Sequence, residues 1–130
     1  MTEIEASMGQ LVDQVVDEVP AITGALVSSA DGFVLASRLP RGDDIDVSAV
    51  AAMSAASLGL TDRLVRLTGD APAACSHHRS GDGQVFVFAV AHVAVLTMLT
   101  DVTADPEQIR MIGHEVTSGL LRLLRGAARV

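Results

Sequence analysis

The sequence predicts an α/β (α+β) domain with one sheet between helical layers and the element order α-β-β-α-β-β-β-α. Two stretches support this prediction. The segment 47–61 is rich in alanine and carries no charge, which is typical of a helix with neighbours on more than one side. The segment 85–99 is an apolar, β-branched run without polar alternation, which indicates strands covered on both faces. At 130 residues, the chain is expected to form one domain over 1–130.

The first half of the chain contains a helix, a hairpin and a second helix. Apolar residues recur at helical spacing over 4–19, and Pro20 ends that pattern. The segments 24–29 and 33–38 are predicted strands on either side of a short Ala-Asp-Gly turn. Asp46 is the expected N-cap of the charge-free helix.

The second half contains three strands and a final helix. The segment 73–79 is more polar than the strands after it and is therefore expected at an edge of the sheet. A Ser-Gly-Asp-Gly turn leads into strand 84–90, and a turn near Ala91 and His92 leads into the last strand. Asp105 is the expected cap of a helix that opens at Pro106.

Composition excludes several classes of protein. The net charge is −7 and all nine basic residues are arginine without a basic stripe, which argues against nucleic-acid binding. Cys75 is the single cysteine, so no internal disulfide forms and a cytoplasmic location is expected. The apolar segment 85–99 is too short for a membrane span and His92 interrupts it, so we expect no membrane insertion.

No motif in the chain indicates an enzyme. The phosphate-binding G-x-x-x-x-G-K-[ST], the dinucleotide G-x-G-x-x-G and the hydrolase G-x-S-x-G patterns are missing, so neither catalysis nor a cofactor is expected. In the segment Cys75-Ser76-His77-His78, Cys75 and His77 would share one strand face. A metal site needs three or four ligands, so we expect no metal and interpret these as edge-strand residues that contact a second copy of the chain.

The charge-free helix presents two usable faces. One carries Val47, Val50, Ser54, Leu58 and Val65; the other carries Ala49, Met53, Ala56, Leu60 and Leu64. The small residues of the second face let another helix approach closely, and in a chain this short a second copy can supply that helix. A helix wrapped entirely by its own domain fits the pattern equally well.

Several phrases resemble the roadblock (dynein light chain) family. They are I-T-G-A-L-V-S-S-A-D-G-F-V-L-A-S at 22–37, the Ala- and Ser-rich helix, the G-D-G turn, and L-T-x-L-T-D at 96–101. The resemblance spans roughly 12–124. Abundant Ala, Val and Arg without Lys suggests a GC-rich bacterial gene, which points to the bacterial branch whose members sit beside Ras-like GTPases.

The resemblance implies a profilin-like, roadblock-like five-stranded antiparallel sheet, with the second helix on one face and the terminal helices on the other. It also implies homodimers or heterodimers that join through the second helices and the third strands, here 74–79, and we expect a homodimer. The expected dimer interface comprises Met53, Ala56, Leu60, Leu64, Cys75 and His77.

The function implied is a non-enzymatic module that binds or regulates a small Ras-like GTPase, as a scaffold or as an activator of GTP hydrolysis. The alternative is a small-molecule-binding sensory domain, against which the chain offers only three aromatic residues. The expected partner-binding surface comprises Ala49, Met53, Ala56, Leu60 and Arg63.

Overall fold

The computed structural model describes residues 2–40 and 44–128, and its elements follow the predicted order. The helices are α1 Glu3–Glu18, α2 Val47–Arg66 and α3 Pro106–Ala128. The strands are β1 Ile22–Ser29, β2 Val34–Arg38, β3 Cys75–Arg79, β4 Gln84–Val90 and β5 Ala94–Thr100.

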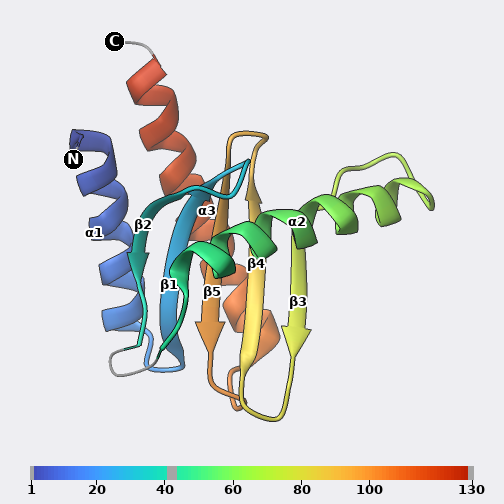
Figure 1. The fold of residues 1–130 in the computed structure, drawn as a ribbon, viewed down its shortest axis with the longest axis horizontal. Helices are drawn as coiled ribbons and strands as arrows, with labels where there is room; N and C mark the ends of the chain where they lie inside the picture. Colours follow the sequence, from blue (N-terminus) through green and yellow to red (C-terminus); the bar gives the residue numbers. More distant parts are fainter. Residues whose placement is uncertain (1, 41–43, 129–130) are drawn as a thin grey trace.

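The five strands form one antiparallel sheet in the order β2-β1-β5-β4-β3. Helix α2 crosses one face of the sheet, and α1 and α3 cover the other (Figure 1). This arrangement confirms the predicted sheet between helical layers. It also confirms that the polar strand β3 lies at an edge.

The main core lies between the sheet and the pair of helices α1 and α3. Alternate side chains of β4 and β5 point into it and meet the apolar stripes of the two helices. Its largest buried members are Met8, Ile22, Phe86, Phe88, Leu96, Met98, Ile109 and Leu120. The segment 85–99 lacks polar alternation because one face of its strands lies against this core and the other face lies against α2.

The layer between α2 and the sheet is smaller and more polar. Its apolar cluster contains Leu58, Val87 and Val95, with alanines around it. Ser28 and Thr97 are fully buried, and their hydroxyl oxygens have no hydrogen-bond partner within the described part of the chain. The apolar cluster under α2 is therefore smaller than the core under α1 and α3, and two buried hydroxyl groups lie beside it.

Arg38 fixes the edge strand β2 to α1. Its guanidinium group donates to Asp17 at 2.9 Å and to Asp13 at 3.3 Å. These carboxylates, Asp17 first, raise the pKa of Arg38. Arg38 is thus paired within its own domain.

Candidate interaction surface on helix α2 and strand β3

Helix α2 begins where the sequence predicts. The side chain of Asp46 accepts a hydrogen bond from the Ala49 amide at 3.1 Å, which satisfies one of the free donors of the first turn. Arg63 and Arg66 lie in the last turn, where cations complement the helix dipole.

One of the two predicted faces of α2 packs on the sheet. Ser54 and Leu58 are buried, and the three valines of this face are half-buried: Val47, Val50 and Val65. The predicted second face is turned to solvent. We call this face the α2 ridge, defined by Ala49, Met53, Ala56, Leu60, Arg63 and Leu64.

The α2 ridge is unusually apolar for a solvent-exposed surface. Met53 is 72% exposed, Leu60 70% and Leu64 62%, and Leu67, directly after the helix, is 83% exposed. The C-terminal part of α2 extends past β3, beyond the edge of the sheet (Figure 1). Contiguous apolar surface of this kind marks an interaction site more often than a freely solvated helix.

Asp62 holds this extended end of α2 against the segment that leads to β3. Its carboxylate accepts a hydrogen bond from the Ala73 amide at 2.8 Å and from Arg66 Nε at 2.9 Å. The Ala73 bond, followed by the Arg66 bond, lowers the pKa of Asp62. The strand starts at Cys75, later than the predicted residue 73, and the Ala73 amide before it is bonded to Asp62.

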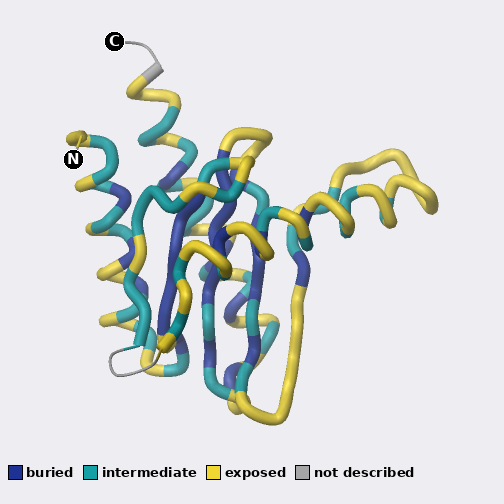
Figure 2. Tube along the Cα trace, viewed as in Figure 1, coloured by how far each residue is buried: buried dark blue, intermediate teal, exposed yellow. Residues whose placement is uncertain are grey.

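Strand β3 adjoins the α2 ridge and has an open edge. Within the described residues it pairs with β4 alone, and it is exposed along most of its length (Figure 2). Unpaired strand edges can pair with another chain. The α2 ridge and the β3 edge are thus neighbouring surfaces. The ridge exposes apolar side chains, and the edge exposes backbone groups without strand partners.

Cys75 and His77 share the sheet face that carries Phe86 and Phe88, as predicted. Cys75 is half-buried against the main core, and burial raises the pKa of its thiol, so the reactive thiolate is disfavoured. His77 stacks on Phe86, with ring centroids 4.2 Å apart and planes 9° apart.

Gln84 fixes the orientation of His77. The Gln84 amide nitrogen donates to the carbonyls of Asp101 at 3.1 Å and Ala104 at 3.0 Å. Its Oε1 atom is therefore the acceptor for His77 Nε2, at 2.7 Å. No pattern in the sequence indicates this buried glutamine, because its partners lie far along the chain.

His78 lies on the opposite face and connects β3 to α2. Its Nε2 atom is 3.0 Å from Ser57 Oγ on α2 and 3.2 Å from Ser76 Oγ on its own strand. The contact couples the positions of the ridge helix and the edge strand. Ser57 was missed by the sequence analysis because a serine within an Ala- and Ser-rich helix carries no distinguishing pattern.

Two features are absent from the described residues. Among the described residues, no three His, Cys, Asp or Glu side chains gather closely enough to hold a metal ion. None of the described helices combines the length and apolar character required for a membrane span.

Solved structures of other proteins share this fold. The solved structure described as "MglB with tetrameric arrangement" has a TM-score of 0.87 and 21% identity, over 98% of this chain and 94% of that chain. Gliding protein MglB from Thermus thermophilus has a TM-score of 0.83 and 21% identity, over 95% and 92%. Acanthamoeba castellanii profilin IA has a TM-score of 0.63 and 16% identity, over 87% and 95%. These similarities confirm the profilin-like, roadblock-like fold.

The sequence comparisons decide the family. No curated protein sequence matches the chain. The family model described as Roadblock/LC7 domain matches residues 8–100, which is most of the chain. The chain therefore belongs to the Roadblock/LC7 family.

Proposed function

We propose that this protein is a self-associating, non-enzymatic module that binds or regulates a small Ras-like GTPase in the bacterial cytoplasm. The observation that carries the proposal is the α2 ridge, an exposed apolar helix face next to an open strand edge. Membership of the Roadblock/LC7 family and the fold shared with MglB support it.

Self-association would cover the α2 ridge and the β3 edge at once. A second copy can pair with the β3 edge while its own α2 packs beside the ridge, because His78 and Ser57 hold the strand and the helix together. In this proposal Met53, Ala56, Leu60 and Leu64 meet the partner helix. His77 and Cys75 contribute through the strand edge, with the Cys75 side chain turned toward the core.

GTPase binding is proposed on the surface formed by the two paired α2 helices. It shares Met53, Ala56 and Leu60 with the helix contact and adds Ala49 and Arg63. The surface offers apolar contacts and one arginine but no nucleotide-binding motif, so it would act through the partner's own catalytic residues, as a scaffold or as an activator.

Titration calorimetry tests the proposal with the small Ras-like GTPase encoded nearest to this gene, loaded in turn with GDP and with a non-hydrolysable GTP analogue. Tighter binding to one nucleotide state would establish a regulator or effector. Equal binding to both would establish a scaffold. No binding to either form would overturn the GTPase proposal.

A further inference from the structure

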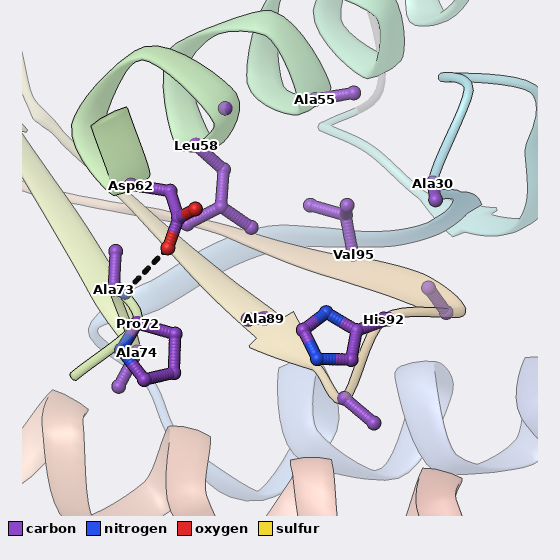
Figure 3. Close-up of a pocket in the computed structure, with 13 residues that line it drawn as sticks. Ala30, Ala55, Leu58, Asp62, Pro72, Ala73, Ala74, Ala89, His92 and Val95 are labelled. Carbon is purple, nitrogen blue, oxygen red and sulfur yellow. Dashed lines mark hydrogen bonds between the residues drawn. The ribbon is translucent and has the colours of Figure 1, made fainter. Parts of the chain in front are cut away.

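A cleft of about 400 Å³ opens between α2 and the tips of the β1–β2 and β4–β5 hairpins (Figure 3). One wall is the part of α2 around Gly59, and another is the segment 72–74, which leads into β3. The two hairpin tips form the remaining walls, and side chains of the sheet form the floor. Its volume lies within the range of small-molecule sites, about 300–1,000 Å³.

The walls of the cleft are joined by hydrogen bonds of the domain itself. The Asp62 carboxylate accepts from the Ala73 amide at 2.8 Å, which joins α2 to the segment before β3. The Ala30 amide donates to the Val93 carbonyl at 3.2 Å, which joins the two hairpin tips. Because these walls are already held in place, a ligand that enters the cleft has little ordering of the chain to bring about.

The lining of the cleft is almost entirely aliphatic. Most of it consists of alanine side chains, to which Leu58, Pro72 and Val95 add larger apolar groups. None of the described lining residues is a phenylalanine, so apart from the imidazole of His92 no ring is present on which a planar ligand could stack. A lining of this kind fits an alkyl chain better than an aromatic ligand.

The two titratable side chains of the lining, Asp62 and His92, differ in what they can still bind. Both carboxylate oxygens of Asp62 are used within the domain, one by a backbone amide and the other by Arg66 Nε at 2.9 Å. Within the described part of the chain, the hydrogen bonds of histidine rings are those of His77 and His78. The exposed ring of His92, on the turn between β4 and β5, is therefore free to donate a hydrogen bond (Figure 3).

We propose that this cleft binds a medium-chain aliphatic carboxylic acid, whose alkyl chain lies on the alanine-rich lining and whose carboxylate accepts a hydrogen bond from His92. A carboxylate is favoured over a neutral acceptor because charge strengthens the hydrogen bond. A cationic head group is disfavoured because Asp62, the one carboxylate of the lining, is already paired with Arg66. Affinity should grow with the length of the alkyl chain, since each added methylene group is removed from water.

The site goes beyond the proposed function, because it does not use the α2 ridge. Ala55 and Gly59 line the cleft from the side of α2, whereas Met53 and Leu60 belong to the ridge. A bound alkyl chain would add apolar contacts between α2 and the sheet, beside the small cluster around Leu58. The ligand should therefore stabilise the position of α2 and, with it, the position of the ridge.

Two variants should block the cleft from different walls. In Gly59→Leu the new side chain enters open space, because a Cβ at this position meets no heavy atom within 4 Å, and leucine is the better helix former. Ala30→Leu acts from a hairpin tip, away from the ridge, and so tests the cleft even where Gly59→Leu alters self-association. Gly9→Leu is the matched control on α1, on the opposite side of the sheet and also with no heavy atom within 4 Å. Thermal unfolding verifies that each variant folds.

The probe is sodium octanoate, titrated into the full wild-type chain in a calorimeter. We expect saturable binding of octanoate, weaker binding of butyrate, and weaker binding of octylamine, which has the same chain length and a cationic head. Octanoate binding should be lost in Gly59→Leu and Ala30→Leu and unchanged in Gly9→Leu. His92→Ala should weaken it by about tenfold, the usual effect of losing one hydrogen bond to a charged group.

Lack of saturable octanoate binding to the wild type would overturn the proposal. Equal binding to Gly59→Leu, Ala30→Leu and Gly9→Leu would do so too, because the ligand would then lie outside the cleft. Unchanged affinity in His92→Ala, or octylamine binding as tight as that of octanoate, would overturn the assignment of the carboxylate to His92. A change of oligomeric state in both blocking variants, without octanoate binding to the wild type, would make the cleft a contact between copies. Each of these outcomes leaves the GTPase proposal standing, because that proposal is tested on the ridge.

Discussion

At Gly113, α3 lies directly against the sheet. Gly113 is buried, and a Cβ at this position would overlap the ring of Phe88, which is a core residue and only 3% exposed. The glycine is therefore required by packing between a helix and a strand that are distant in sequence.

Gly113→Ala should lower the free energy of unfolding by about 1–3 kcal/mol, the usual cost of overfilling a packed core. Gly119→Ala in the same helix is the control, because its nearest neighbour would be Leu11 Cδ1 at an ordinary 3.5 Å. The control should raise stability by up to about 1 kcal/mol through helix propensity. Chemical denaturation measures both; equal effects would contradict this description of the contact.

The stability of the fold should depend on pH through the carboxylate of Asp62. Its hydrogen bonds to Ala73 and Arg66 lower its pKa in the folded chain below the ordinary value of 3.8. Its ionised form therefore stabilises the fold above about pH 3.8, and this contribution is lost as the pH falls through the lower, folded pKa.

Asp62→Ala should lower the denaturation midpoint at pH 7, and the difference from the wild type should shrink below about pH 3.8. Asp70→Ala, in the exposed loop after α2, serves as the control and should have little effect at either pH. A difference between Asp62→Ala and the wild type that is independent of pH would show that the ionised carboxylate does not hold the segment.

Among the helices, α2 rests on the smallest apolar cluster. Beside this cluster lie Ser28 and Thr97, whose buried hydroxyl groups have no partner in the described chain, and the end of α2 extends beyond the sheet. By contrast, α3 contributes Ile109 and Leu120 to the main core. Elements with little buried apolar contact open first.

Hydrogen exchange should therefore be faster in α2 than in the first half of α3. The measurement is best made on Met53→Glu, where a second copy should no longer protect α2. Equal protection of the two helices in that variant would contradict the expectation drawn from the small cluster under α2.

The elements were largely predictable because each depends on local pattern. The unalternating run 85–99 predicted strands covered on both faces, and the polar segment 73–79 predicted the edge. The contacts between elements were not predictable. Arg38 with Asp13 and Asp17, or His77 with Gln84, meet only once the strand order is fixed, and no local spacing encodes that order.

The candidate site could be predicted from the sequence only in part, as the two faces of α2 show. Helical spacing separated the buried Ser54 and Leu58 from the exposed Met53 and Leu60, and the structure confirms that division. A cleft between α2 and the tips of two hairpins was not foreseen, because the residues that line it come from segments that only the fold brings together. That the exposed face binds a second copy or a GTPase stays a prediction.

For the whole molecule, the α2 ridge should control self-association. Met53→Glu would place a charge in the helix pair, where desolvation without a partner is costly, and should weaken the dimer at least tenfold. Met111→Glu, on α3, is the matched control because Met111 is 66% exposed and Met53 72%. Sedimentation equilibrium measures the dissociation constants; an unchanged dimer in Met53→Glu would remove the ridge from the interface.

The central claim is that the α2 ridge makes this Roadblock/LC7 protein a partner of a small Ras-like GTPase. Its most direct test is calorimetric titration of the nearest-encoded GTPase into the wild type, Met53→Glu and Met111→Glu. The claim predicts saturable binding to the wild type and to Met111→Glu, and at least tenfold weaker binding to Met53→Glu. Binding that is equal in all three proteins, or absent from all three, would contradict it.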